Sequence, residues 1–233
     1  MAIDPSTLSA GLARLGTVDG PDIGQALEMT VHACVELFDV SGSGLMIADE
    51  QGALRYVAVS DGPGKVLEEV QTDTGQGPCV DTYVENTMID TDDLAAETRW
   101  PDSRETIAGH GVRAVLGVPV RLGGVTVGSL DIYLDRPHWW EESERAAMLH
   151  YSRVVEATLH TALSAHAAGE LADRLQYAVD HRAVVERGIG FVMALRRVDG
   201  PTALRLLRTG ARERGCDIAE VARQVIADRS VPG

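Results

Sequence analysis

Two β-rich runs joined by a pair of glycines constrain the fold of this chain more than any other feature. The segment GVRAVLGVPVRLGGVTVGSLDIYLD (residues 111–135) has β-branched residues on both sides of Gly123–Gly124. Runs of this kind around a two-residue glycine turn predict an antiparallel hairpin. A second pair of strands is predicted in SGLMIADEQGALRYVAVSD, around a turn at Asp49–Gly52.

Helical segments lie between and before these strands. Apolar residues recur at helical spacing across residues 20–38, and helical turns are expected at 64–72 and 79–86. Strand pairs combined with helices in this way predict an α+β domain, in which helices pack on an antiparallel sheet.

The sequence changes character after Pro137, because no proline follows until Pro201 and the intervening sequence favours a long helix. Small residues at 161–170 predict a bend or an interruption near Gly169. Beyond it, apolar residues follow coiled-coil-like spacings of three, four and seven. The residues of this seam are Leu171, Leu175, Ala178, Val185, Ile189 and Val192.

Two shorter helices are predicted near the C-terminus. Pro201 suits a helix start, where its missing N–H costs nothing, and Gly215 suits the end of that helix. Asp217 with Glu220 three residues later predicts a capped start for the last helix. Its apolar stripe consists of Ile218, Val221, Ala222, Val225 and Ile226. Together with the long helix, these elements predict an all-α three-helix bundle.

Charge divides the chain in the same place. Residues 1–170 carry 10 Lys and Arg against 27 Asp and Glu, a net charge of −17, whereas residues 171–233 carry 11 Arg against 8 acids, a net charge of +3. We therefore expect an N-terminal domain over 1–165, with its core at about 20–165, and a C-terminal domain over 166–233. Because so small a bundle is marginal alone, its first helix should gain support from a partner chain or from the N-terminal domain.

Composition indicates a soluble cytoplasmic protein. Three widely spaced cysteines suggest a reducing compartment, and the sequence shows no signal peptide and no apolar run long enough to span a bilayer. We find no nucleophile–base pair, no metal-ligand spacing and no cofactor motif, so the sequence predicts that the chain is not an enzyme.

The C-terminal segment 171–227 resembles the ANTAR family of bacterial transcription antiterminators. The matching pieces, in order, are Leu175 and Ala178 before Arg182, VVERGIGFVM (184–193), TALRLLRTGA (202–211) and DIAEVARQVI (217–226). The resemblance implies a three-helix domain that binds nascent RNA, typically as paired short stem-loops, and prevents a terminator from forming.

The N-terminal part resembles a GAF sensory domain over about residues 20–165. TGQGPCVDTYVENTMIDTDDLAAETRWP (74–101) and GVRAVLGVPVRLGGVTVGSLDIY (111–133) carry this resemblance, and both are like the GAF domains fused to ANTAR tails in actinobacteria. It implies a sensory role and a small-molecule ligand of unspecified chemistry. The two resemblances together imply a signal-responsive RNA-binding antiterminator, active as a homodimer.

The chain departs from the ANTAR pattern in the middle of the long helix. Where the family usually has a small residue, a lysine and a glycine, this chain has Gly188, Ile189 and Gly190. Loss of the cation removes one potential phosphate contact. The alternative interpretation is therefore a sensor or dimerisation scaffold that acts through protein partners and has lost RNA binding. DNA binding is disfavoured, because Arg223 is the only basic residue at the exposed positions of the last helix.

Candidate RNA-binding residues follow from the resemblance and from the positions of the cations. Arg205, Arg208 and Arg212 share one helix face at i, i+3 and i+7, where they form either a phosphate-binding stripe or a solvated face. Arg182 occupies an apolar seam position; the alternative to RNA contact is an interhelical ion pair, for instance with Asp180 or Glu186 of a partner chain. We add Arg187 as a surface cation.

Two further residues have competing interpretations. Gly190 lets either RNA or a neighbouring helix approach the backbone. Cys79, which follows Gly77–Pro78, is a candidate ligand-touching thiol of the sensory domain, although a buried core cysteine is the simpler interpretation. Trp139 and Trp140 are expected to anchor the long helix to the sheet.

Overall fold

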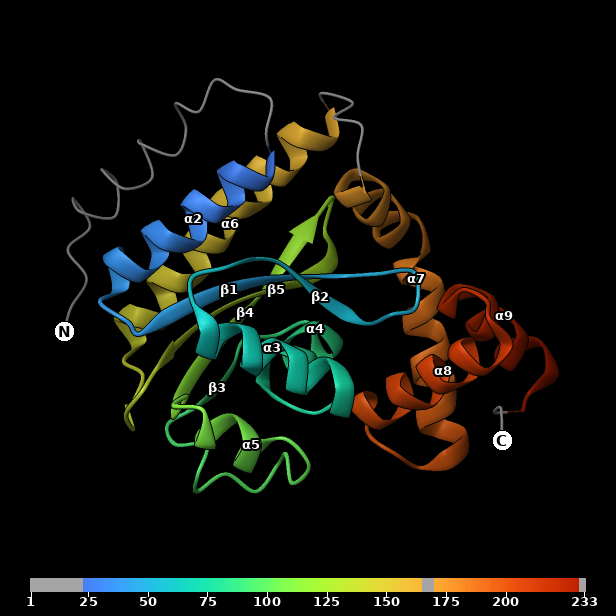
Figure 1. Cartoon of the computed structure of the whole chain (residues 1–233). Helices are drawn as coiled ribbons and strands as arrows, with labels where there is room; N and C mark the ends of the chain where they lie inside the picture. Colours follow the sequence, from blue (N-terminus) through green and yellow to red (C-terminus); the bar gives the residue numbers. More distant parts are fainter. Residues whose placement is uncertain (1–22, 165–169, 231–233) are drawn as a thin grey trace.

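A five-stranded antiparallel sheet forms the centre of the N-terminal domain (Figure 1). This computed structural model describes residues 23–164 and 170–230. The strands are β1 (Gly42–Ala48), β2 (Leu54–Val59), β3 (Ile89–Thr91), β4 (Ala114–Leu122) and β5 (Val125–Leu134). They are ordered β2-β1-β5-β4-β3, and the α+β prediction is confirmed.

Both predicted hairpins are present. In the β4–β5 hairpin Leu122 pairs with Val125, and Gly123 and Gly124 both have positive φ, 58° and 83°. Such angles match the right-handed twist of the flanking strands and favour glycine. The β1–β2 hairpin closes at Ala48 and Leu54, and its turn contains Gly52 at φ 69°.

Helices cover both faces of the sheet, and the helices of the C-terminal part, orange to red, lie at one end of it (Figure 1). The helices are α2 (Ile23–Phe38), α3 (Gly62–Thr74), α4 (Pro78–Glu85), α5 (Arg104–Gly109), α6 (Glu142–Ser164), α7 (Glu170–Arg196), α8 (Gly200–Arg214) and α9 (Ile218–Asp228). Helices α2 and α6 pack on one face, and α3 and α4 pack on the other. We call residues 23–164 the sheet domain and α7–α9 the C-terminal bundle.

Successive side chains along each strand point to opposite faces of the sheet, so a separate core lies on each face. In β1, Leu45 and Ile47 face α2 and α6, whereas Met46 and Ala48 face α3 and α4. Trp140 is buried and its Nε1 donates to the carbonyl of Thr91 at 3.2 Å, so this residue anchors the start of α6 as predicted. The same prediction is wrong for Trp139, whose side chain is 74% exposed.

The C-terminal bundle follows its local sequence signals with one exception. Asp199 caps α8 by accepting from the Thr202 N–H at 2.9 Å, and Gly215 ends it in the left-handed conformation. Asp217 makes no side-chain capping bond to α9, so that prediction is wrong. Instead, the Ile218 N–H, one of the donors left free at the start of α9, bonds to the Glu50 carbonyl of the sheet domain at 3.0 Å.

The apolar seam of α7 is filled by the same chain. Leu175 and Ala178 join the core shared with α2 and α6, and Val185, Ile189 and Val192 join the core shared with α3, α4, α8 and α9. We expected α7 to be supported either by a partner chain or by the N-terminal domain. In this structure the sheet domain packs against it. The bend expected near Gly169 lies outside the described residues.

Candidate nucleic-acid interface

Arg182 is buried between the C-terminal bundle and the sheet domain. Its Nη2 donates to the Tyr83 carbonyl at 2.8 Å, and its Nε donates to Glu186 Oε1 at 2.9 Å. The guanidinium carbon lies 3.9 Å from the centroid of the Tyr83 ring, a cation–π contact. With only 2% of its surface exposed, Arg182 is not accessible to a polyanion in this arrangement. The Arg182–Glu186 ion pair lies within α7, four residues apart, and is not the interhelical pair that we considered from the sequence.

Arg205, Arg208 and Arg212, which share one face of α8, differ in exposure: the face begins at the domain interface and ends in solvent. Arg208 is 8% exposed, and its Nη2 donates to the Thr72 carbonyl at 2.9 Å. Arg205 is half-buried and packs its aliphatic chain over Gly75, whereas Arg212 is exposed. Burial lowers the pKa of Arg208, and the nearby carboxylates of Asp49 and Asp73 act in the opposite direction.

Both buried arginines bind the C-terminal ends of helices. Thr72 lies in the last turn of α3, and Tyr83 lies in the last turn of α4. The final four carbonyls of a helix have no partner within it, and this end carries the negative pole of the helix dipole. The sheet domain therefore offers two sites suited to cations, and Arg182 and Arg208 occupy both.

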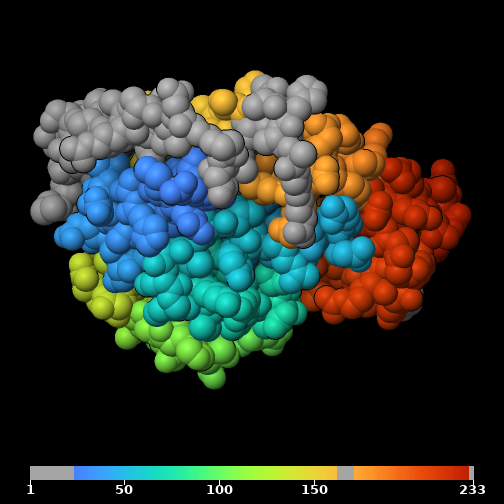
Figure 2. Space-filling view, turned by 45° about the horizontal axis from the view of Figure 1, so that its top comes forward, coloured from blue at the N-terminus to red at the C-terminus, as the bar shows by residue number. Residues whose placement is uncertain are grey.

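A third contact joins the β1–β2 turn to the α8–α9 loop. Besides the bond from Ile218 to Glu50, Gln51 Nε2 donates to the Cys216 carbonyl at 3.3 Å. A Cβ at Gly52 would lie 2.4 Å from Ile218 Cδ1 and would clash, so glycine allows this close approach. In Figure 2 the red surface of α8 and α9 adjoins the blue surface around this turn.

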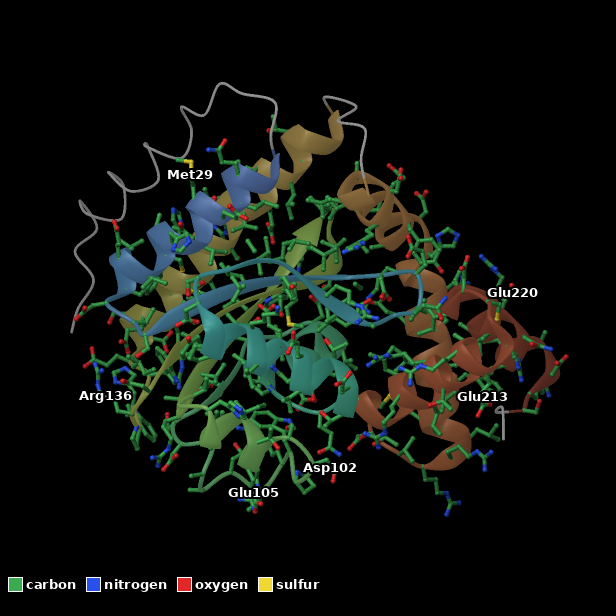
Figure 3. All side chains as sticks on the ribbon, in the orientation of Figure 1. Met29, Asp102, Glu105, Arg136, Glu213 and Glu220 are labelled. Carbon is green, nitrogen blue, oxygen red and sulfur yellow. The ribbon has the colours of Figure 1, made fainter. Side chains whose placement is uncertain are left out.

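The remaining candidates are exposed. Among the described residues, the side chain of Arg187 bonds only to the Ala183 carbonyl, through its Nε at 3.1 Å, and a Cβ at Gly190 would meet no heavy atom of another element within 4 Å. Helix packing therefore does not explain Gly190. That role belongs to Gly188, where a Cβ would lie 2.6 Å from the Cβ of Ala222 on α9. Figure 3 labels Glu213 on the same bundle, and this exposed residue follows Arg212 directly in α8.

Ile189, which replaces the usual lysine, is 6% exposed and belongs to the core that contains Val185 and Val192. A lysine here would place an ammonium group in an apolar interior, which costs several kcal/mol unless the group is paired or reaches water. With the C-terminal bundle packed against the sheet domain, which we call the docked arrangement, an isoleucine suits this buried position.

Cys79 lies in the interior of the sheet domain. It is fully buried, as expected for a core cysteine, and Gln71 Nε2 donates to its Sγ at 2.8 Å. Burial raises the pKa of Cys79, and neighbouring Asp131 adds to the effect. A thiol held neutral in this way is a poor nucleophile.

Unpartnered carboxylate oxygens lie close to this thiol. Glu68 is 2% exposed and neither oxygen has a hydrogen-bond partner in the described part of the chain. Asp131 is 1% exposed; Ser129 Oγ donates to its Oδ2 at 2.8 Å, but Oδ1 has no such partner among the described residues. Burial raises the pKa of both groups, to about 7 for Asp131. Sequence reasoning missed both residues, because a single acidic residue in a helix or strand gives no local sign of burial.

Over residues 23–164 and 170–230, no group of three or more His, Cys, Asp or Glu side chains is placed to hold a metal ion. In the same ranges, no helix combines the length and apolar character needed to cross a membrane.

The described chain thus consists of an antiparallel sheet domain followed by a helical bundle. Residues 22–159 match the GAF domain family, and residues 173–226 match the ANTAR domain family. The chain belongs to the GAF domain family and carries an ANTAR domain after its GAF domain. Both are families of regulatory domains, and the predicted order of the two is confirmed. No curated protein matches the chain.

Solved structures share the fold of the sheet domain. The GAF domain of a phosphoenolpyruvate-protein phosphotransferase from Coxiella burnetii has a TM-score of 0.57 at 20% identity, covering 70% of this chain and 96% of its own. A domain of a putative two-component sensor histidine kinase from Sinorhizobium meliloti 1021 has a TM-score of 0.54 at 23% identity, covering 64% and 98%. Free methionine-R-sulfoxide reductase from Neisseria meningitidis has a TM-score of 0.56 at 16% identity, covering 68% and 89%. At these identities the likeness concerns the fold alone.

Proposed function

We propose that this protein is a signal-responsive, RNA-binding transcription antiterminator, in which the GAF domain senses a small molecule and the ANTAR domain binds stem-loop RNA. The observation that carries the proposal is the ANTAR match over residues 173–226, a segment that carries ten arginines. We divide the chain functionally into 1–165 and 166–233. We further propose that the chain is cytoplasmic, since three free cysteines suit a reducing compartment, and that it acts as a homodimer, in keeping with the paired stem-loops expected as its RNA target.

The proposed RNA surface combines exposed and docked residues. Arg187, Gly190 and Arg212 are exposed, Arg205 is half-buried, and the remaining two, Arg182 and Arg208, are held by the sheet domain. Full RNA contact by this set therefore requires the ANTAR helices to leave the ends of α3 and α4.

The docked arrangement is then a low-affinity state in equilibrium with a released state. A signal shifts this equilibrium only if it binds the two states unequally. RNA that binds the released state must compete with the two arginine–carbonyl bonds and the apolar contacts of α7. This competition supplies the link between sensing and RNA binding.

The test is a gel-shift titration with RNA that carries two short stem-loops, at low salt. Val84→Trp on α4 should weaken docking, because a Cβ at Gly200 would already lie only 2.8 Å from Val84 Cγ1. We expect the affinity for RNA to rise about tenfold, which corresponds to about 1.4 kcal/mol of lost docking free energy. The matched control is Val154→Trp on α6, which is also half-buried and lies on the opposite face of the sheet.

A second variant tests the RNA surface itself. Arg212→Gln should weaken binding and reduce the slope of log Kd against log salt by about one phosphate contact. If folded wild-type chain and Val84→Trp both fail to bind RNA at low salt, the antiterminator proposal is wrong.

The second candidate function is a small-molecule sensor or dimerisation scaffold that acts through protein partners. The observation that favours it is the burial of Ile189, which is 6% exposed, at the position where ANTAR domains usually carry a lysine. An absence of RNA binding in Val84→Trp, with a released bundle, would support this candidate.

A further inference from the structure

Two buried carboxyl groups share the layer between the sheet and α3. Asp131 lies on the central strand β5 and is 1% exposed, and Glu68 enters the layer from α3 and is 2% exposed. In the sheet, Asp131 pairs with Gly44 of β1 on one side and with Gly117 of β4 on the other. A Cβ at Gly44 would overlap Glu68 Oε1, and a Cβ at Gly117 would lie 2.5 Å from Asp131 Oδ1. The two glycines therefore make room for both carboxyls in a closed interior.

Neither carboxyl has the partners that a buried charge needs. Both oxygens of Glu68 and Oδ1 of Asp131 lack hydrogen-bond partners in the described chain. So does Oγ1 of the fully buried Thr82, which lies over Gly117 beside Asp131 Oδ1. The charges that act on Glu68 are those of Asp131 and Glu69, and both are negative. Ionisation of the pair would place two like charges in a layer without compensation, which is strongly unfavourable.

The surrounding elements bring no cation into this layer. The only Lys, Arg or His residues on α3, α4, β1, β4 and β5 are Lys65 and Arg121. Lys65 lies over the ring of Tyr56 on the outside of the sheet domain, and Arg121 Nε donates to Asn86 Oδ1 at 2.9 Å. The further titratable group beside the pair is the thiol of Cys79 on α4, which is neutral as well.

Burial therefore keeps the pair protonated at neutral pH. It raises the pKa of Asp131 to about 7. It also raises the pKa of Glu68, and the charge of Asp131 adds to that effect. If α3 moves outward, water reaches both carboxyls and their pKa values fall towards ordinary ones. The two positions of α3 thus differ in how tightly they hold protons.

The position of α3 bears directly on the docked arrangement. Thr72 follows Glu68 by four residues, one helical turn further along α3. The Oγ1 of Thr72 donates to the Leu54 carbonyl of β2 at 2.6 Å, and the Thr72 carbonyl accepts from Arg208 Nη2 at 2.9 Å. A movement that brings Glu68 to water also shifts this carbonyl, and Arg208 loses its acceptor.

We propose that Glu68 and Asp131 make the docking of the C-terminal bundle depend on protons. With both carboxyls protonated, α3 stays on the sheet and Thr72 holds Arg208; loss of a proton lets α3 move outward and releases α8. Because the docked arrangement holds protons more tightly than the released one, docking weakens as pH rises towards the pKa values of the docked form. Protons bias the same equilibrium as the signal proposed above, and they act on RNA binding only through that proposed function.

Carbon-13 NMR of the carboxyl groups, assigned in the wild-type full chain, tests the protonation. The signals of Glu68 and Asp131 should have the position of protonated carboxyls at pH 5.5, and that of Asp131 should move to the ionised position by pH 8.5. A signal of either group that is already at the ionised position at pH 5.5 would overturn the proposal.

Amide protection factors, which correct for the pH dependence of exchange itself, test the coupling. Protection in α8 should fall about tenfold between pH 5.5 and pH 8, as expected when docking releases one proton over one pH unit. Protection in α6, on the opposite face of the sheet, should stay constant. Glu68→Gln and Asp131→Asn keep the side-chain shape without the charge, so each should reduce the fall and the double variant should remove it. Glu36→Gln, at an exposed position of α2, is the control and should retain it.

Three results of the exchange measurement would overturn the coupling: unchanged protection in α8, an equal fall in α6, or a full fall in the double variant. The NMR titration uses the wild-type chain, so the first half of the proposal remains testable even if a variant fails to fold. Because neither measurement contains RNA, a failure here is distinguishable from a failure of the antiterminator proposal, which the gel shift decides.

Discussion

Arg182 lies over the ring of Tyr83 while its guanidinium donates to the main-chain carbonyl of that same residue. One residue of α4 thus holds a cation of α7 in two ways, through its side chain and through its backbone. The contact joins residues 99 positions apart in the sequence and helps to hold the ANTAR helices against the GAF domain.

The first prediction concerns the stability of this contact. Arg182→Met keeps most of the side-chain volume but removes the bonds to Tyr83 and Glu186, so the free energy of unfolding should fall by about 1–3 kcal/mol. Arg187→Met, at an exposed position of the same helix, should change it by less than about 0.5 kcal/mol. Urea denaturation measures both. Equal effects would show that the Tyr83 contact contributes no net stability.

The second prediction separates two glycines in one helix. Gly188→Ala places a Cβ 2.6 Å from the Cβ and 3.1 Å from the Cα of Ala222, so it should destabilise the chain by about 1–3 kcal/mol. The added Cβ of Gly190→Ala meets no neighbour within 4 Å in the part of the chain that the structure describes, and the variant should stabilise α7 by about 1 kcal/mol. Thermal denaturation of both variants measures whether each is less or more stable than the wild-type chain.

Gly190→Ala also tests RNA approach. If the RNA backbone passes close to Gly190, the more stable variant binds RNA more weakly in the gel shift. Unchanged affinity would remove Gly190 from the proposed RNA surface.

The third prediction concerns pH. Burial raises the pKa of Asp131 to about 7 from an ordinary value of 3.8. Between these values the folded chain holds a proton that the unfolded chain has released. The free energy of unfolding should therefore fall as pH rises, by about 1.4 kcal/mol per pH unit from this group. Asp131→Asn should flatten the dependence between about pH 4 and pH 7. Parallel curves from urea denaturation of the two proteins would refute this.

The fourth prediction concerns the three thiols. Cys34 and Cys79 are fully buried, and burial raises both pKa values, to about 12 for Cys34. Cys216 is partly exposed. A thiol reagent at mildly alkaline pH should react rapidly with Cys216 and with the other two only after unfolding. Peptide mapping of the labelled protein identifies the reacting residue, and early labelling of Cys79 would indicate an open sensory interior.

Local sequence signals predicted the elements of this fold well. The turn at Gly123–Gly124 and the end of α8 at Gly215 depend on backbone angles that few residues other than glycine adopt, so both are readable from short segments. The cap expected from Asp217 is absent, and the first N–H of α9 bonds to a distant carbonyl, that of Glu50, which no local signal indicates.

The candidate interface was predictable only in part. The misplaced charge of Arg182 in an apolar seam indicated an unusual environment, but its partner on α4 follows only from the tertiary arrangement. Likewise, the i, i+3, i+7 spacing of Arg205, Arg208 and Arg212 defines one helix face without saying what faces it. The structure places the sheet domain against part of that face.

The acceptors of Arg182 and Arg208 are peptide oxygens, which every amino acid supplies. Substitution of the side chain at residue 72 or 83 leaves these oxygens in place as long as α3 and α4 keep their ends. The acceptors of these two bonds are thus set by where α3 and α4 end, whereas the cation–π contact depends on the side chain of Tyr83. Relatives whose surfaces have diverged widely could retain the same closed form, while a one-residue insertion near either helix end would release it.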